Sequence, residues 1–151
     1  MKLQPYDILM HKNSNNIIHK IIRHVLGSEY HHVSLLLDNF HTVDINYKNP
    51  LQIMHLNKKL KQFNGYRIPN LTEQNKELMV NFIQKTLNSK YDLREIINYF
   101  GFGLNDRDDR WICISWMDDL LEYSGVKIVK DIQVHRFEDL IEKYGLVRVN
   151  E

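Results

Sequence analysis

The chain has 151 residues, 43% of them hydrophobic, which is the size and composition of one domain with a single core. Lys and Arg number 20 against 19 Asp and Glu, so the net charge of +1 gives no overall field to hold an acidic polymer, and we expect no nucleic-acid partner. The sequence has neither a secretory signal pattern nor a run of the ~18 apolar residues that cross a bilayer, so we expect a cytoplasmic protein with no stable membrane insertion.

The first third of the chain predicts a strand, a helix and a hairpin. Residues 6–12 (YDILMHK) are typical of a short strand. Isoleucines at positions 17, 18, 21 and 22 have the spacing of an amphipathic helix that Asn15 or Asn16 can start and Gly27 can end. Two apolar runs, residues 30–38 and 41–47, flank an Asn-containing turn, which is typical of a β-hairpin.

The rest of the chain mixes helices with short strands. We expect helices over residues 50–60, 72–88, 91–104 (broken by Gly101 and Gly103), 113–124 (followed by Gly125) and 137–144, and strands over residues 65–69 and 146–149. These elements predict an α+β fold, a small antiparallel sheet packed with helices, as one domain over residues 1–151.

The predicted hairpin carries polar side chains that a structural strand does not need. Side chains alternate across a strand, so His32 and Ser34 share one face, and Asp44 lies on one face of the returning strand. A loop with an odd number of residues, such as 38–40 or 39–41, brings His32 and Asp44 to the same face. A histidine beside a carboxylate is an oriented general base, so this pair is a candidate half of a catalytic site.

Cys113, the single cysteine of the chain, is the candidate for the other half. It follows a polar loop and begins a predicted helix, and a helix start and a nearby imidazolium both favour the reactive thiolate form. We therefore expect Cys113 as nucleophile, His32 as base and Asp44 as the orienting carboxylate. The spacing leaves open the alternative that Cys113 is a buried hydrophobic residue.

Five segments follow one another in a recognisable order: YDILMH, SEYHHVSLLLDNFHTVDIN, SKYDLREIINYF, WICISWMDDLLEYSG and FEDLIEKYGLVRV. Together they resemble the circularly permuted papain-like proteins of the NlpC type, especially the YiiX-like amidases. The resemblance spans nearly the whole chain and implies a permuted papain-like fold with its catalytic cysteine at a helix N-terminus. It implies the same roles for Cys113, His32 and Asp44, and it puts His31 at the position of a family serine, on the opposite face.

Several positions depart from the pattern of these proteins. Tyr6 replaces the usual Gly before an Asp, Ser34 stands where Gly is common, and Asp44 is shorter than the frequent Glu. Ile114 and Ser115 replace the Ser and Glu that usually follow the cysteine. The residue types of the trio are kept, so these changes concern substrate specificity more than chemistry.

The leading hypothesis is a cysteine hydrolase, a peptidase or amidase, that cleaves an amide bond in a peptide or a cell-wall-type substrate through an acyl-enzyme. Two alternatives stay open. One is a lipid acyl hydrolase or acyltransferase of the same fold, and the other is a catalytically silent binding module. The expected partner is thus a peptide, a cell-wall fragment or a lipid-like substrate, which we expect Trp111, Ser34 and Tyr91 to contact.

Eight histidines raise the question of a metal, but we expect no metal site and no other cofactor. His19 and His24 are five residues apart and diverge on a helix, while His31 and His32 point to opposite faces of a strand. The helix of residues 16–26 also carries a basic rim, for which a solvated face and a membrane-surface face are the alternatives. That rim is formed by Lys20, Arg23 and His24.

Overall fold

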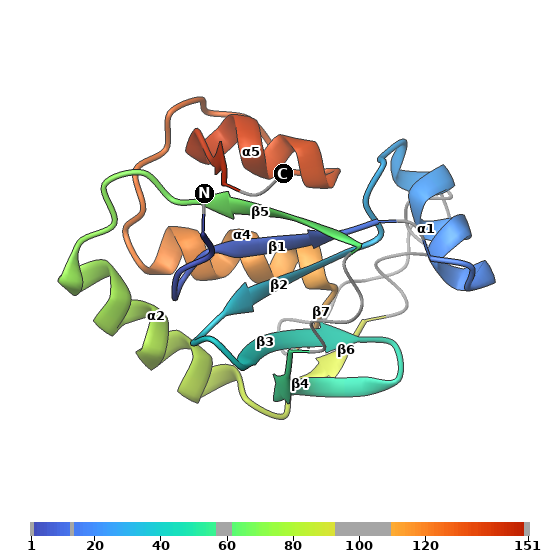
Figure 1. The fold of residues 1–151 in the computed structure, drawn as a ribbon, viewed down its shortest axis with the longest axis horizontal. Coiled ribbons are helices and arrows are strands. Elements are labelled where there is room, and N and C mark those ends of the chain that lie inside the picture. Colours follow the sequence, from blue (N-terminus) through green and yellow to red (C-terminus); the bar gives the residue numbers. More distant parts are fainter. Residues whose placement is uncertain (1, 13, 57–61, 93–109, 150–151) are drawn as a thin grey trace.

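A six-stranded antiparallel sheet, in the strand order β4-β3-β2-β1-β5-β8, forms the centre of the fold (Figure 1). The computed structural model that shows it describes residues 2–12, 14–56, 62–92 and 110–149, with the backbone alone at residues 110 and 111. The strands of this sheet are β1 (Ile8–His11), β2 (His32–Leu36), β3 (His41–Asn46), β4 (Asn49–His55), β5 (Phe63–Arg67) and β8 (Val147–Arg148). A separate parallel pair joins β6 (Lys90–Tyr91) to β7 (Arg110–Trp111).

The helices of the described part are α1 (Ile17–Leu26), α2 (Glu73–Thr86), α4 (Cys113–Tyr123) and α5 (Phe137–Tyr144). Figure 1 shows α4 running behind the sheet, with α1 and α2 at opposite ends of the molecule. Helix α4 packs against β2, and α2 packs against α4. The predicted α+β architecture, an antiparallel sheet covered by helices, is confirmed. None of the helices in the described residues is long and apolar enough to cross a membrane.

The ends of the two amphipathic helices follow the predicted capping residues. At the start of α1 the Asn16 side chain accepts a hydrogen bond from the Ile18 N–H at 2.9 Å, and at its end Gly27 adopts a φ of 57°. At the start of α2 the Thr72 hydroxyl accepts a hydrogen bond from the Asn75 N–H at 3.1 Å. These contacts satisfy backbone groups that a helix end leaves without partners.

The hairpin of β2 and β3 has the odd loop that the sequence predicts. Leu35 pairs with Val43, and the Leu37 N–H donates to the His41 carbonyl at 2.9 Å, which leaves residues 38–40 as the loop. The Asp38 carboxylate closes this loop by accepting the N–H groups of Phe40 and His41. Register therefore places alternate residues of both strands on a common face.

The helix predicted over residues 50–60 is wrong in its described part, where strand β4 stands instead. Thr42 pairs with Met54 and Asp44 with Gln52, so the β3 backbone supplies partners that a local pattern cannot reveal. Because β4 is an edge strand, it tolerates Pro50, which has no N–H to donate. The strand pairs with β3 and so holds Asp44 in place.

Most of the helix predicted over residues 91–104, and its glycine break, lie outside the described residues. Of that segment the structure describes Tyr91, which belongs to β6, and Asp92, which is buried. The predicted polar loop that follows also lies outside, apart from the backbone of its last residue.

An ion pair between the buried Asp7 and the partly exposed Arg67 lies at the start of β1. The Asp7 carboxylate, 2% exposed, accepts hydrogen bonds from Arg67 at both oxygens, at 3.0 and 2.9 Å, and from the Gln4 N–H at 2.8 Å. Tyr6, just before it, has a φ of 70°, in the left-handed region that favours glycine. A glycine would adopt this backbone conformation without steric cost.

Candidate active site

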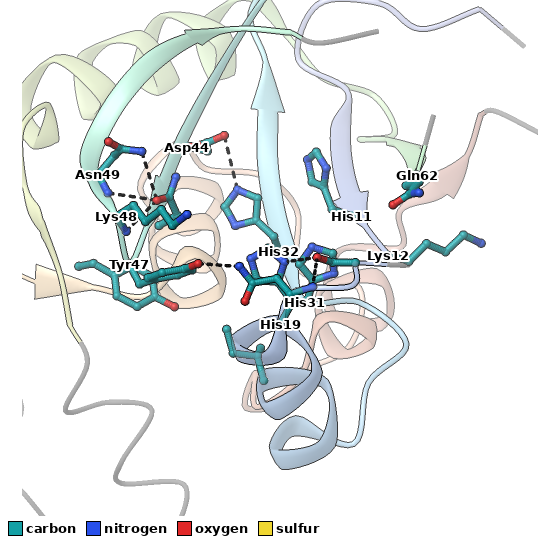
Figure 2. Close-up of a pocket in the computed structure, with 15 residues that line it drawn as sticks. His11, Lys12, His19, His31, His32, Asp44, Tyr47, Lys48, Asn49 and Gln62 are labelled. Carbon is teal, nitrogen blue, oxygen red and sulfur yellow. Dashed lines mark hydrogen bonds and ion pairs between the residues drawn. The ribbon is translucent and has the colours of Figure 1, made fainter. Parts of the chain in front are cut away.

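A pocket of about 370 Å³ opens at the opposite end of β1, where His11 faces His32 across the sheet (Figure 2). Its walls come from the end of β1, from α1, from the start of β2 and from the turn between β3 and β4. Polar side chains dominate the lining. Among the described residues that form it, Asp44 is the single acid and Lys12 and Lys48 are the strong bases.

His32 and Asp44 meet in this pocket. His32 Nε2 lies 3.5 Å from Asp44 Oδ2, as the dashed line in Figure 2 shows, and the two side chains are 16% and 12% exposed. The predicted register and the predicted approach of Asp44 to the imidazole are thus confirmed. The other carboxylate oxygen, Oδ1, is buried without a hydrogen-bond partner in the part of the chain that is described. Asp44 can therefore accept a further hydrogen bond.

Cys113 is the first residue of α4, and its thiol lies close enough to His32 to raise the pKa of the imidazole. Burial lowers the pKa of His32, but the neighbouring side chains of Asp44 and Cys113, which interact with the imidazolium, raise it by more, to about 10. His32 is therefore protonated at neutral pH.

Cys113 does not line the polar pocket. The residue is 4% exposed and lines a cavity of about 10 Å³, too small to hold more than a single water. Ile22 and Tyr91 line both spaces, so they form the wall between the pocket and the thiol. A substrate in the pocket reaches His32 directly, but it reaches the sulfur only if this wall moves.

The three residues expected to contact substrate have different positions. Tyr91 lines the pocket, as expected. Ser34 does not: it is 1% exposed and its hydroxyl hydrogen-bonds His11 Nε2 at 3.0 Å, because its side chain points beneath the pocket wall. Ser34 positions a wall residue instead of touching substrate. The side chain of Trp111 lies outside the described residues.

Three further histidines line the pocket, and the sequence analysis did not place them there. The ring of His19 stacks on His31 at 4.1 Å, and the ring of His11 lies 5.2 Å from His32. His31 and His32 line this pocket with different neighbours, since His31 stacks on His19 of α1 and His32 approaches Asp44 of β3. His11 could have been placed in the pocket from its pairing with His32. That pairing follows only if the register between β1 and β2 is known.

The additional histidines are held neutral. Burial lowers the pKa of His31 to about 3, aided by the charges of His19 and His32, and it lowers the pKa of His11 well below its usual range, aided by His32. Burial and His32 also lower the pKa of His19. His31 Nδ1 is buried and has no hydrogen-bond partner among the described residues. The pocket thus combines one charged imidazole with three neutral ones.

These histidines do not form a metal site. His11 Nε2 bonds Ser34 and His19 Nδ1 bonds Ser14 at 2.6 Å, so both nitrogens are already engaged. Within the described residues, no group of three or more His, Cys, Asp or Glu side chains converges on a point where a metal ion could sit. The donor set present does not fit a bound metal.

A side-chain hydrogen bond caps the start of α4. Ser115, at the third helical position, accepts a hydrogen bond from the Ile112 N–H at 3.2 Å. A glutamate in that position makes the same contact in a capping box. Ser115 therefore retains the cap beside Cys113 with a shorter side chain.

The sequence matches no protein-family model and no curated protein. A solved structure that resembles this one is YiiX from Escherichia coli O157:H7, described as a metalloprotein. The TM-score is 0.71, the two sequences are 15% identical, and the similarity covers 100% of this chain and 98% of that one. The chain therefore has the YiiX-like fold over its whole length.

Proposed function

We propose that the protein is a cysteine hydrolase that cleaves an amide bond, built as a permuted papain-like enzyme. The observation that carries this proposal is the contact series from Cys113 through His32 to Asp44, with Cys113 at the first residue of a helix. An imidazole that contacts a thiol on one side and a carboxylate on the other has the geometry of nucleophilic catalysis.

In the proposed reaction the Cys113 thiolate adds to the carbonyl carbon of the amide and forms a C–S bond. The imidazolium of His32 then donates its proton to the departing nitrogen as the C–N bond breaks, which leaves a thioester and a free amine. Neutral His32 next takes a proton from water, whose oxygen attacks the thioester and releases the acid and the thiol. Asp44 orients the ring and stabilises its charged form.

The polar pocket supports the assignment of a polar substrate. Its lining includes Lys12 and Lys48 as well as the polar side chains of His31 and Asp44, which are groups that a peptide or a cell-wall-type fragment can bind. The side chains of Ile22 and Tyr91 must separate for the scissile carbonyl to reach the sulfur. Turnover then includes an opening step as well as chemistry.

The metal in the name of YiiX does not enter this proposal. The donor atoms of the described residues do not converge on a metal position, and two of the histidine nitrogens are bonded to serines. Every step above uses the side chains of this chain and water.

The test is acylation of Cys113 by an activated ester, followed by intact-mass spectrometry. The native protein should gain one acyl group and lose it with time, and His32→Ala should reduce the acylation rate by about 100-fold, the usual size of a general-base contribution. Asp44→Asn should have a smaller effect in the same direction. Equal rates in native protein and His32→Ala would exclude the enzyme.

The matched control is His41→Ala. His41 lies in the same hairpin and pairs with Asp38 at 2.9 Å, closer than His32 lies to Asp44, but both side chains are about half exposed and neither lines the pocket. Its removal should leave acylation unchanged. An equal loss in both variants would mean that hairpin damage, not base removal, lowers the rate.

A catalytically silent binding module is the second candidate, and the burial of Cys113 favours it. Such a protein would use the polar pocket for recognition and keep the thiol as a core residue. Absence of any acyl adduct on the native protein, with the pocket still able to bind a peptide or cell-wall fragment, would support this function.

A further inference from the structure

Helix α1 has two different faces. Asn16, at its start, and His19 and Ile22 line the pocket. The other face carries Ile17 and Ile21, whose exposed fractions are 71% and 46%. Large exposed apolar side chains are ordinary when scattered, but these two lie one helical turn apart and border the same groove.

The groove is apolar at its base and basic at its rim. Its volume is about 490 Å³, and it is lined by Ile17, Lys20, Ile21, His24 and Val25. The ten residues of α1 include no Asp or Glu, while Lys20, Arg23 and His24 are basic or become so on protonation. An apolar strip flanked by basic side chains complements a surface that is apolar inside and negative at its boundary.

We propose that α1 is a docking surface for an anionic lipid bilayer. Ten residues of helix extend about 15 Å, too short to cross a membrane but long enough to lie in its interface. Ile17 and Ile21 enter the boundary between headgroups and acyl chains, and Lys20 contacts lipid phosphates. A second copy of the chain is a poorer occupant, because a symmetric pair of α1 helices brings Lys20 and His24 towards their own counterparts.

Docking in this way has a consequence for the candidate active site. The inner face of α1 supplies Ile22, which separates the polar pocket from Cys113, and Val25 borders both the outer groove and the cavity beside the thiol. A bilayer that engages α1 therefore contacts the element that covers the nucleophile. This docking does not depend on catalysis, so it can be tested whether or not the enzyme proposal holds.

The experiment measures co-sedimentation of the full chain with vesicles of phosphatidylcholine alone and of an equal mixture of phosphatidylcholine and phosphatidylglycerol. The native protein should bind the mixed vesicles more tightly, and added salt should weaken that binding. The double variant Ile17→Ser/Ile21→Ser should bind at least about tenfold more weakly. Lys20→Glu should weaken binding to the mixed vesicles by about tenfold and leave binding to neutral vesicles unchanged.

Matched variants remove the same kind of side chain elsewhere. Ile53→Ser/Val147→Ser removes two apolar residues that are 51% and 52% exposed on β4 and β8, and Lys127→Glu makes the same change of charge on an exposed loop. Both should bind like the native protein. Equal binding by native protein and Ile17→Ser/Ile21→Ser overturns the proposal, and so does light scattering that shows a native dimer that the double variant converts to a monomer.

Discussion

The two ends of β1 hold their polar side chains in opposite ways. At one end, both oxygens of Asp7 accept hydrogen bonds, from Arg67 and from the Gln4 backbone. At the other end, His31 Nδ1 and Asp44 Oδ1 are buried and have no partner among the described residues. A buried polar atom without a partner costs about 1–3 kcal/mol of stability. The first end satisfies its buried charge, whereas the second carries a cost in stability that is typical of sites retained for a role other than folding.

Removing the charged partner of Asp7 should give the largest loss of stability. Arg67→Met leaves the Asp7 carboxylate, 2% exposed, without its charged partner, and it should lower the free energy of unfolding by about 3 kcal/mol. Urea denaturation measures this. Acylation of Cys113 should not change, because the pocket lies at the far end of the strand.

The control for that variant is Lys130→Ala, which removes an ion pair with Glu142 whose side chains are 59% and 46% exposed. A pair so exposed contributes less than about 1 kcal/mol. Equal losses in the two variants would contradict the distinction between the buried and the exposed pair.

Acid should destabilise the protein through His31. The pKa of His31 is lowered to about 3, below the usual ~6.5 of an unfolded chain, so protons favour unfolding and stability falls as the pH drops below about 6.5. His31→Phe, which keeps a ring stacked on His19, should reduce the stability lost between pH 8 and pH 5 by about 1–2 kcal/mol. Urea titrations at both pH values measure it, and an unchanged difference would show that His31 is not held neutral.

Opening the wall of the pocket should expose the thiol. Ile22→Ala removes atoms that separate Cys113 from the polar pocket and should raise the rate of iodoacetamide alkylation about tenfold. A tenfold change in rate corresponds to about 1.4 kcal/mol less free energy to expose the thiol. Ile21→Ala, on the exposed face of the same helix, should leave the rate unchanged. If both variants react alike, loosening of α1 and not the wall controls access.

Relieving the backbone strain at Tyr6 should raise the stability of the protein. Tyr6 holds a φ of 70°, which a glycine adopts without steric cost, so Tyr6→Gly should raise the free energy of unfolding by up to about 1 kcal/mol. Thermal unfolding measures the gain. A loss would show that the contact of the Tyr6 ring with Lys76 stabilises more than the backbone strain destabilises.

The sequence predicted those features that depend on neighbouring residues. Asn16 and Thr72 mark helix starts because a side-chain oxygen can reach an N–H two or three residues later. The approach of His32 to Asp44 followed from strand alternation and an odd loop.

Features that depend on pairing between distant segments could not be predicted. Residues 50–60 were expected to form a helix, but their described part forms strand β4. The hydrogen bonds that decide this conformation come from β3, which the local sequence does not reveal. The presence of His11 in the pocket depends on the β1–β2 register, and the burial of Cys113 depends on Ile22 and Tyr91 from two other elements. Such packing leaves no local periodicity in the sequence.

Strands β1 to β4 pair in the order in which the ribosome makes them. His32 and Asp44 thus lie on two strands joined by a three-residue loop, whose closure has a low entropic cost. Cys113 enters much later, at the start of α4, after β5 and α2 have been synthesised. The order of synthesis therefore allows the imidazole and its carboxylate to be in place before the thiol emerges, so that Cys113 is the last of the three proposed catalytic residues to be added.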